Sequence, residues 1–304
     1  MKDLIPIKKS HIRFYNDFPL YYISKNGDPL LYKKKDKTLD REMLDRNQYP
    51  RFFIKKEDEA EVVRQLQEVL NIKLAKAISS QGVEAIRAAM CDIVEEALSG
   101  PIDASLSALP ETIEILLMGA RKNSGLLESL ATIHTVGKKL VGHCVNVLSI
   151  TAQYCFFKNY PDDQVKELCL CALLHDVGLG KIDRQLFESA EKLSDKEFSE
   201  YKTHPAQGYK EVMKYPMFSK TVEKTVLEHH ERLDGSGYPN KMTDICFEAQ
   251  VIGLIDSYEQ LKYHEKKFRK ALNPFEALQI IKADVVKAKY NKKVFVDLCS
   301  CLIK

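Results

Sequence analysis

The sequence predicts a mainly α-helical protein, in which an all-helical bundle follows a small β-rich (α+β) N-terminal module. Two short apolar-aromatic runs flank an Asn-Gly pair near the N-terminus, as in a β-hairpin. From Glu59 onward, apolar residues recur at positions i, i+3, i+4 and i+7, as on one face of a helix. We therefore expect a β-rich module over residues 1–57, a helical linker region over 58–121 and a helical domain over 122–304.

The N-terminal module has its strongest signal at Asn26-Gly27, which lies between the two runs and predicts a hairpin turn. Residues 49–58, YPRFFIKKED, predict a further short strand. Four lysines after the hairpin give the module a basic character. We interpret them as a solvated edge that opposes strand pairing, rather than as a site for an anionic ligand. They are Lys33, Lys34, Lys35 and Lys37.

Helical stretches then follow one another to the C-terminus. Gly100-Pro101 ends the first stretch, and Asn159 to Asp163 and Asn273-Pro274 supply further stops and starts. The predicted helices cover residues 59–100, 109–123, 127–157, 161–177, 194–215, 220–231, 247–263 and 273–285.

Composition limits the class of protein. The chain is 45% hydrophobic and 29% charged, as is usual for a folded soluble protein, and its net charge of +3 does not favour a nucleic acid polymer as partner. The N-terminus lacks the apolar core of a signal peptide, and no apolar run approaches the roughly 20 residues of a membrane span. These features predict a cytoplasmic protein.

The eight cysteines are expected to be reduced and mostly buried, because several lie in apolar helical stretches. Two pairs have Cys-x-Cys spacing, whereas structural zinc sites usually separate the two cysteines by two to four residues. The pairs are Cys169 with Cys171 and Cys299 with Cys301. We give them no role in binding zinc.

His175 and Asp176 form the most informative pair of ionisable residues. They end a mostly apolar run, CALLHD, where such a pair is costly unless it is paired or bound to a metal. The imidazole offers one nitrogen, and the carboxylate has two oxygens that can bridge two metals. Gly178 and Gly180 allow a close turn after the pair.

Other histidines and one aspartate extend this pattern across several predicted helices. Such a set suggests a site built from facing helices. Three further histidines have ordinary surroundings and are expected on the surface or satisfied in the core. The first set is His143, His204, His229, His230 and Asp256; the second is His11, His134 and His264.

Residues 122–304 resemble the HD superfamily of metal phosphohydrolases, and within it the HD-GYP cyclic-di-GMP phosphodiesterases of bacterial signalling. The resemblance rests on His175-Asp176 and on three longer segments. These are residues 193–209 (LSDKEFSEYKTHPAQGY), 229–239 (HHERLDGSGYP) and 248–261 (EAQVIGLIDSYEQL). The N-terminal module resembles, more weakly, the small β-containing domain found ahead of some HD-GYP domains.

The resemblance implies a binuclear metal site in an HD-type helical bundle. A first metal would be held by His143, His175, Asp176 and Asp256, and a second by His204, His229 and His230, with Asp176 bridging the two. It implies hydrolysis of cyclic-di-GMP by a metal-bridging hydroxide, giving the linear dinucleotide pGpG. Two metals about 3.5–4 Å apart can clamp a phosphodiester in this way. Imidazole and carboxylate ligands without thiolate suit iron first and manganese next, with zinc disfavoured.

Two positions depart from the family pattern. Leu179 occupies the position of a phosphate-binding lysine, so either Lys181 takes over that catalytic and substrate-binding role, or phosphate binding and turnover are weakened. Lys139 lies four residues before His143, where some members carry a glutamate that binds a third metal. A cation cannot ligate there, which predicts a two-metal site and favours one cleavage over complete hydrolysis to GMP.

Further roles come with alternatives. In KKFRKAL (266–272), Arg269 or Lys266 contacts substrate, or the segment is a solvated helix face. Tyr238 lines the mouth of the site or offers a surface to a signalling partner, as the N-terminal module also could. Gly235 and Gly237 permit positive φ and an abrupt exit from the helix, which Pro239 fixes. Glu231 and Asp234 orient the histidines, or are solvated carboxylates.

Two other functions fit the same residues. In the first, the chain is a catalytically weak module that binds cyclic dinucleotides or proteins. In the second, it is an HD phosphohydrolase for another cyclic dinucleotide or nucleotide. A helical protein with coincidental histidines would leave the long motifs unexplained.

Overall fold

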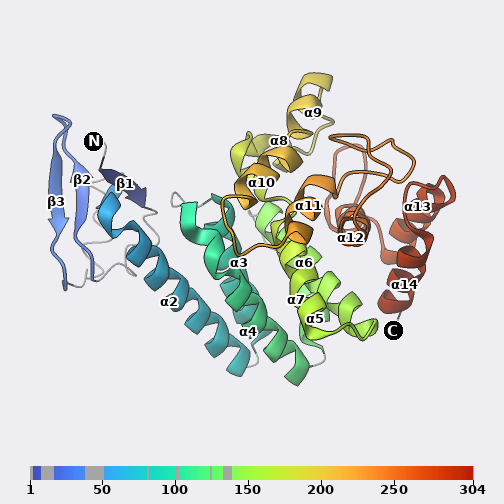
Figure 1. Ribbon diagram of the computed structural model, residues 1–304, viewed down its shortest axis with the longest axis horizontal. Coiled ribbons are helices and arrows are strands. Elements are labelled where there is room, and N and C mark those ends of the chain that lie inside the picture. The colour runs from blue at the N-terminus through green and yellow to red at the C-terminus, as the bar shows by residue number, and fades with distance from the viewer. Residues whose placement is uncertain are drawn as a thin grey trace.

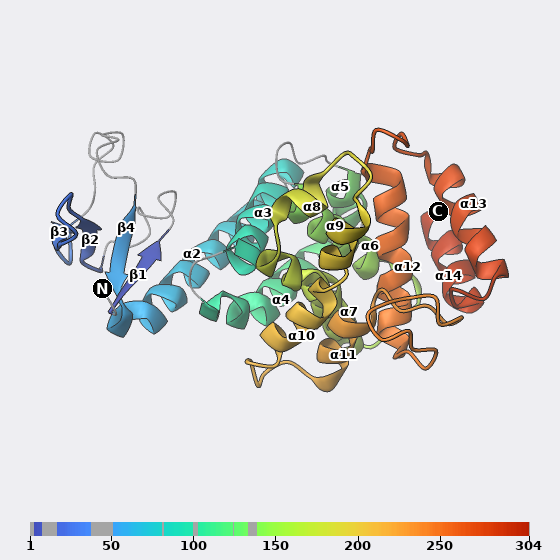
Figure 2. The ribbon, with the colours of Figure 1, turned by 90° about the horizontal axis from the view of Figure 1, so that it is seen from above.

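The computed structural model describes residues 3–7, 17–37, 51–80, 82–99, 103–123, 125–132 and 139–303. A small sheet lies at one end of the molecule, a helical bundle forms the middle, and the C-terminal helices α13 and α14 lie at the other end (Figures 1 and 2). The predicted fold class, a mainly helical HD-type bundle after a β-rich module, is confirmed. The predicted domain boundaries at residues 57 and 121 stay predictions.

The sheet is antiparallel, with strand order β1-β4-β2-β3. Strands β2 and β3 form the predicted hairpin, and Gly27 in its turn has a positive φ of 88°. The strand predicted within residues 49–58 is β4, whereas β1 escaped prediction because four residues with a proline carry little signal. The strands are β1 (Leu4–Ile7), β2 (Leu20–Ile23), β3 (Pro29–Lys33) and β4 (Phe52–Lys55).

The interpretation of the lysines after the hairpin is wrong for Lys33. Its side chain is buried, 4% exposed, at the end of β3, and its amine donates to the carbonyl of Lys34. Burial lowers the pKa of the Lys33 amine. Lys34, Lys35 and Lys37 are exposed, as expected for a solvated edge.

The helical part begins with α2 after one short 3₁₀ turn, and several predicted helices are divided in two. The stretch predicted over 59–100 is α2 and α3, and the stretch over 194–215 is α9 and α10, since periodicity continues across these short breaks. The helices are α2 (Glu59–Ser79), α3 (Val83–Ser99), α4 (Leu109–Lys122), α5 (Leu126–Thr132), α6 (Lys139–Phe157), α7 (Asp162–Leu174), α8 (Arg184–Glu188), α9 (Asp195–Tyr201), α10 (His204–Val212), α11 (Lys220–Glu228), α12 (Phe247–Tyr263), α13 (Pro274–Val286) and α14 (Lys292–Leu302).

Helix starts follow local capping chemistry. Ser194 and Asn273 each form a capping box, with Glu197 and Glu276 respectively, at the starts of α9 and α13. Ser219 accepts from the backbone N–H of Val222 at the start of α11. The proposed helix stop at Gly100-Pro101, and His11 and His134, lie outside the described residues.

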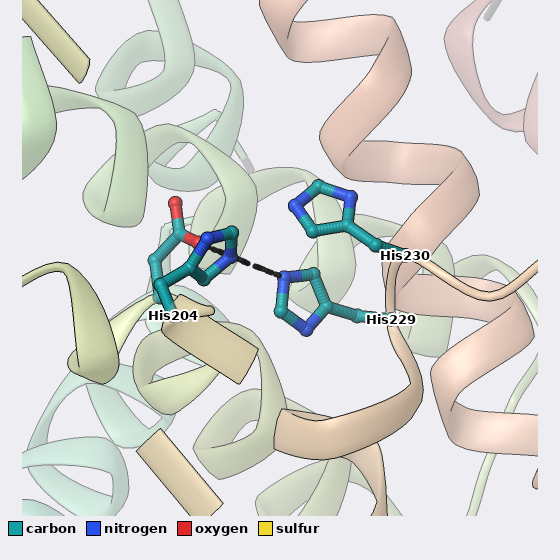
Figure 3. A group of neighbouring side chains, drawn as sticks. His204, His229 and His230 are labelled. Atoms are coloured by element: carbon teal, nitrogen blue, oxygen red, sulfur yellow. Dashed lines mark hydrogen bonds and ion pairs between the residues drawn. The ribbon is translucent and has the colours of Figure 1, made fainter. Parts of the chain in front are cut away.

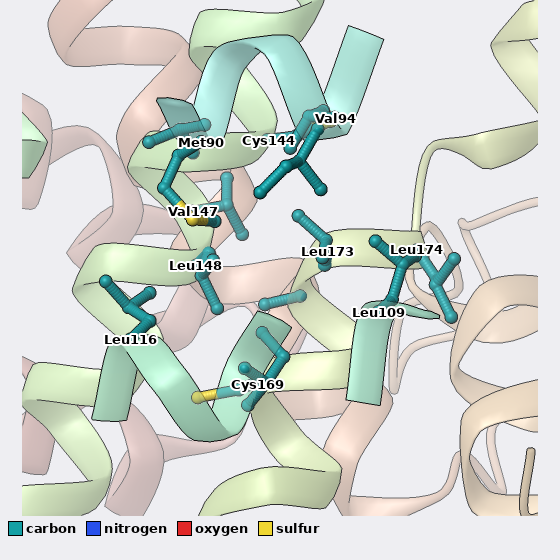
Figure 4. Packing of buried hydrophobic residues seen from close by; sticks show 14 of the residues in the cluster. Met90, Val94, Leu109, Leu116, Cys144, Val147, Leu148, Cys169, Leu173 and Leu174 are labelled. Carbon is teal, nitrogen blue, oxygen red and sulfur yellow. The ribbon is translucent and has the colours of Figure 1, made fainter. Parts of the chain in front are cut away.

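Helices α6 and α7 form the centre of the core, with α3 and α4 packed against them (Figure 4). Helix α6 is long and apolar enough to match a membrane span, contrary to the expectation that no run would come close. However, 83% of the matching window is buried within the protein, as in the core helix of a bundle.

The cysteines lie where the sequence predicted. Five are buried and three are half-buried, and in the described residues no cysteine belongs to a group that could hold a metal. Burial raises the pKa of the Cys155 thiol to about 12, and it also raises the pKa values of Cys144, Cys169 and Cys171. These side chains are therefore neutral packing groups.

Candidate metal centre

The predicted ligands come together where several helix ends meet the N-terminal part of α6 and the middle of α12. His143 projects from α6 and Asp256 from α12, whereas His204 is the first residue of α10. His175-Asp176 directly follow α7, and His229-His230 directly follow α11. All seven are buried except His230, whose side chain is 12% exposed. The structure thus assembles in one place the ligands that the sequence spreads over more than a hundred residues.

One half of the centre forms around oxygen Oδ2 of Asp176. The Nε2 atoms of His143 and His175 are each 3.4 Å from this oxygen and 3.1 Å from one another. Oδ1 of Asp256 is 3.3 Å from Nε2 of His143. These four side chains are the predicted first ligand set.

The other half forms around Oδ1 of the same carboxylate. Nε2 of His204 is 3.1 Å from this oxygen and Nε2 of His229 is 3.6 Å from it. Figure 3 shows His204, His229 and His230 close together, with a dashed line that joins His204 to His229. The Nε2 atoms of His204 and His229 are 3.3 Å apart. His230 belongs to the same group, in which all ligand atoms lie within 4.8 Å of one another. Asp176 therefore offers one oxygen to each half.

The histidine tautomers are set by the backbone. The Nδ1 atoms of His175, His204 and His229 lie 2.7–2.9 Å from the carbonyls three residues earlier. A carbonyl only accepts, so each Nδ1 carries the hydrogen and donates it. When these imidazoles are neutral, their Nε2 lone pairs face the centre, as metal ligands require.

This arrangement fits a divalent cation. Converging lone pairs and carboxylate oxygens repel one another at 3.1–3.6 Å unless a positive charge lies between them. Oδ1 of Asp176 and Nε2 of His230 are buried and make no hydrogen bond in the described part of the chain. The donor set, imidazole and carboxylate, is one that divalent transition metals prefer.

Burial and neighbouring charges shift the pKa values of Asp176, His229 and His230. Burial would raise the pKa of the Asp176 carboxyl, but His175, His143 and His204 hold this pKa well below its usual range. Burial lowers the pKa of His229 to about 4, and it holds the pKa of His230 well below its usual range. His229 and His230 therefore offer neutral imidazoles beside an ionised carboxylate, which is the state that binds a metal.

Glu259 is an important residue that the sequence reasoning missed. Its Oε2 accepts from Nδ1 of His143 at 2.5 Å, and its Oε1 accepts from the amide of Asn146 at 2.6 Å. The carboxylate is fully buried, and it fixes the ring of His143 with Nε2 toward Asp176. The available signal was its spacing, one helical turn after Asp256, where a side chain faces the same way.

His264 completes this network. Its Nε2 lies 3.3 Å from Oε2 of Glu259, and its side chain is buried. This matches the expectation of a satisfied core histidine. Burial alone would raise the pKa of Glu259, but His143 and His264 hold it far below its usual range.

Gly178 positions His204 through close packing. A Cβ atom at residue 178 would lie 1.9 Å from the carbonyl oxygen of His204 and 2.5 Å from the backbone nitrogen of Gly208. The start of α10 thus rests directly on the turn that follows Asp176. The predicted close turn at this glycine is present, and it brings the two halves of the centre together.

In the part of the chain that the structure describes, Glu231 and Asp234 form hydrogen bonds to the loop and none to a histidine. Glu231 is buried and accepts from the backbone N–H groups of Asn240 and Met242, at 2.6 and 3.0 Å. Asp234 accepts from the backbone N–H and the hydroxyl of Ser236. Both carboxylates therefore shape the loop after His230.

Tyr238 turns inward from that loop. Its ring stacks on the ring of His230, with centroids 4.6 Å apart, and its N–H donates to the carbonyl of His230. Gly235 has a positive φ of 76°, as its predicted place in the turn requires. Tyr238 also lines an open cleft together with His230 and Asp256, and its two predicted roles stay predictions.

The two positions that depart from the family pattern are occupied by residues with partners inside the protein, and so is Lys181, the lysine expected near the phosphate. Lys181 lies 3.3 Å from Oε2 of Glu211, which Lys214 also contacts at 2.8 Å. Leu179 is 2% exposed and belongs to the core. Lys139 donates to the carbonyl of Glu188 at 3.0 Å.

The basic segment after α12 is used mainly for structure. The guanidinium of Arg269 donates to the carbonyls of Gln260, Leu261 and His264 at 2.8–3.0 Å, and so caps the end of α12. Lys266 donates to the carbonyl of Ser189 at 2.6 Å. Burial lowers the pKa of Lys266, and the positive charges of Lys139 and Arg269 lower it further.

An open cleft of 370 Å³ leads away from the centre. It begins at His230 and Asp256 and runs between α12 and α13. Its lining residues are Tyr201, His230, Arg232, Tyr238, Asp256, Ser257, Gln260, Leu261, Ile280, Ile281, Asp284 and Tyr290. A larger cavity of 970 Å³ lies elsewhere, between α5, α6 and α14, and none of the candidate ligands lines it.

Comparison with known proteins gives a consistent result. The family model described as "HD domain" matches residues 125–294, more than half of the chain. The cyclic di-GMP phosphodiesterase PA4108 of Pseudomonas aeruginosa is 28% identical over 195 residues, which cover 64% of this chain and 47% of that protein. The cyclic di-GMP phosphodiesterase PdeB of Borreliella burgdorferi is 30% identical over 154 residues, which cover 50% and 40%.

Two further likenesses concern specificity and fold. The 3′3′-cGAMP-specific phosphodiesterase 3 of Vibrio cholerae is 29% identical over 116 residues, covering 38% of this chain and 25% of that protein. This chain therefore matches less than half the length of each of these three relatives. The solved structure of Bd1817, an HDG"Y"P protein from Bdellovibrio bacteriovorus, has a TM-score of 0.65 at 21% identity, covering 99% of this chain and all of that one. That likeness concerns the fold alone.

Proposed function

Because the chain belongs to the HD domain family, whose model matches residues 125–294, we propose that it is a metal-dependent phosphodiesterase for cyclic dinucleotides, with cyclic-di-GMP as its main substrate. The observation that carries this proposal is the pair of ligand groups that share Asp176, one around each carboxylate oxygen. The named activities of the relatives from Pseudomonas and Borreliella support the substrate.

The proposed ligand sets follow the two halves of the centre. His143, His175, Asp176 and Asp256 would hold one divalent ion, and His204, His229 and His230 would share Asp176 around a second. Ions bound there would polarise the phosphodiester and lower the pKa of water. We propose iron as the resident metal, manganese next and zinc last.

The chain's own residues prepare the reaction. Glu259 holds His143 in the ligating orientation, and the three backbone carbonyls do the same for His175, His204 and His229. Water adds across one P–O3′ bond, so that phosphorus keeps the new oxygen and the released 3′ oxygen takes a proton. The product is linear pGpG. Lys139, a cation four residues before His143, supports a site of two ions and a single cleavage.

Lys181 remains the proposed phosphate contact, and it would have to exchange Glu211 for the substrate. Its present ion pair, together with the burial of Leu179, favours a second candidate function. In that case the protein binds cyclic dinucleotides and turns them over slowly or not at all. Lys266 and Arg269 would contact substrate only after giving up their carbonyl partners.

The test uses the full chain purified without oxygen. Its metal content is measured first, and the protein is then loaded with Fe(II), Mn(II) or Zn(II) and incubated with cyclic-di-GMP. We expect about two ions per chain and pGpG as the product. Tight binding without product would support the second function, and absence of both binding and product with every metal would refute the first.

Two substitutions at the centre make this test specific. We expect His175→Ala and Asp176→Ala to lose metal and activity together while circular dichroism shows a folded bundle. Full metal content in either variant would contradict the ligand assignment.

We also propose that the enzyme acts in the cytoplasm and that a signalling partner contacts the loop around Tyr238 or the N-terminal module.

A further inference from the structure

The cleft beside the centre has the composition of a base-binding site. Its walls carry the rings of Tyr201, Tyr238 and Tyr290, and its inner end is formed by His230 and Asp256. Aromatic rings bind nucleobases by stacking. A phosphate held at the centre would place the neighbouring nucleotide in this cleft.

The outer part of the cleft carries polar groups that can read the edge of a base. Gln260, one helical turn after Asp256 on α12, and Asp284 on α13 both line the cleft. Oδ1 of Asp284 pairs with the amine of Lys289 at 2.9 Å. Among the described residues, no hydrogen bond of the Asp284 Oδ2 atom and none of the Gln260 side-chain amide is present. Both groups are therefore available to a ligand.

We infer that this cleft binds one guanine of the substrate and that Asp284 is the residue that selects guanine over adenine; this inference rests on the proposed function. A carboxylate only accepts hydrogen bonds. Guanine presents two donors on its pairing edge, N1–H and the N2 amine, which match the two carboxylate oxygens. Its O6 accepts, and the amide of Gln260 donates to it.

Adenine reverses this pattern. It has no N2 amine, and its N1 carries a lone pair that would face the carboxylate of Asp284. A site built to accept from a substrate N–H rejects the analogue that lacks it. The distinction matters here because the relatives include phosphodiesterases named for cyclic di-GMP and others named for 3′3′-cGAMP.

Lys289 provides a matched control. Asp284→Asn replaces one of the two acceptor oxygens with an NH₂ donor, which would face a guanine donor, and it also breaks the ion pair with Lys289. Lys289→Met breaks the same ion pair and keeps the carboxylate. Lys289 does not line the cleft. A guanine preference that depends on the carboxylate is lost in the first variant and retained in the second.

The first experiment measures binding by isothermal titration calorimetry, so it does not depend on turnover. For the wild type, we expect cyclic-di-AMP to bind about 10- to 100-fold more weakly than cyclic-di-GMP, as for one well-matched bidentate contact. Asp284→Asn should weaken cyclic-di-GMP binding by a similar factor and change cyclic-di-AMP little. Equal affinity of the wild type for both ligands, or an unchanged preference in Asp284→Asn, would overturn the inference.

The second experiment uses 3′3′-cGAMP, which has one guanine and one adenine. A guanine held in the cleft places one particular phosphodiester at the centre, so we expect the metal-loaded wild type to release mainly one of the two linear isomers, pGpA or pApG. Asp284→Asn should release both, and Lys289→Met mainly one. Equal amounts of both isomers from the wild type would refute the inference. If no dinucleotide is cleaved, that result counts against the proposed function, and the calorimetry then decides the role of Asp284.

Discussion

Replacing Glu259 by glutamine should weaken metal binding at one half of the centre. The two carboxylate oxygens serve different donors, Oε2 for His143 and Oε1 for Asn146. Glutamine has only one oxygen, so in Glu259→Gln one of these donors would face an NH₂ group. Either the Nδ1–H of His143 would lose its acceptor, or the side chain at position 259 would lose the bond from Asn146 that holds it in place.

The size of the effect follows from the geometry. The bond from His143 is 2.5 Å long and the carboxylate is fully buried, so it is a charge-assisted hydrogen bond shielded from water. Such bonds contribute about 1.5–3 kcal/mol. At about 1.4 kcal/mol per factor of ten, this corresponds to a loss of roughly 10- to 100-fold in affinity for one ion.

The assay is a metal titration in competition with a chelating dye, using Mn(II) and Zn(II). Glu223→Gln is the matched control, because Glu223 is a buried carboxylate on α11 that pairs with Lys220 and does not contact the histidines. We expect Glu259→Gln to weaken one of two binding steps and Glu223→Gln to weaken neither. If Glu259→Gln binds both ions with wild-type affinity, Glu259 does not orient His143.

Three further predictions concern the surroundings of the centre. Gly178→Ala should displace the start of α10, since the added Cβ would lie 1.9 Å from the carbonyl of His204; we expect a loss of about 1–3 kcal/mol in urea unfolding and weaker metal binding. Unchanged metal affinity would show that this contact does not position His204. Leu179→Lys should cost about 3 kcal/mol or more, because it buries an unpaired charge in the core, and increased turnover from a stable variant would contradict the packing argument. Burial would raise the pKa of the Glu211 carboxyl, but Lys214 and Lys181 lower it below its ordinary value of 4.5. The ionised carboxylate therefore stabilises the folded state above pH 4.5, and this stabilisation is lost as the pH falls through the lower pKa of the folded protein. Urea unfolding should therefore show a difference between wild type and Glu211→Gln at pH 7 that narrows by pH 4, and a difference that grows toward low pH would reverse the assignment.

The fold class and the set of candidate ligands could be predicted from the sequence by itself. Helical periodicity is a local property, and the hairpin depends on Asn26-Gly27, so both can be inferred without tertiary contacts. The cost of an unpaired ionisable pair singled out His175-Asp176, and the resemblance of the longer segments to the HD-GYP family implied the full ligand set. The structure then brought all seven together.

Other features depended on tertiary packing alone. Glu259, a glutamate in an ordinary helical stretch, became important because α6 brings His143 and Asn146 to it. Lys181, the lysine expected at the phosphate, forms an ion pair with Glu211 of α10. Arg269 donates to carbonyls at the end of α12 and so caps that helix. Asp284 became part of the cleft because α13 packs beside α12. Arg269 finds its partners only five to nine residues earlier in the chain. For the other three the physical reason is the same: the partner of a polar side chain depends on which segment packs against its own, and the spacing of residues along the chain does not contain that information.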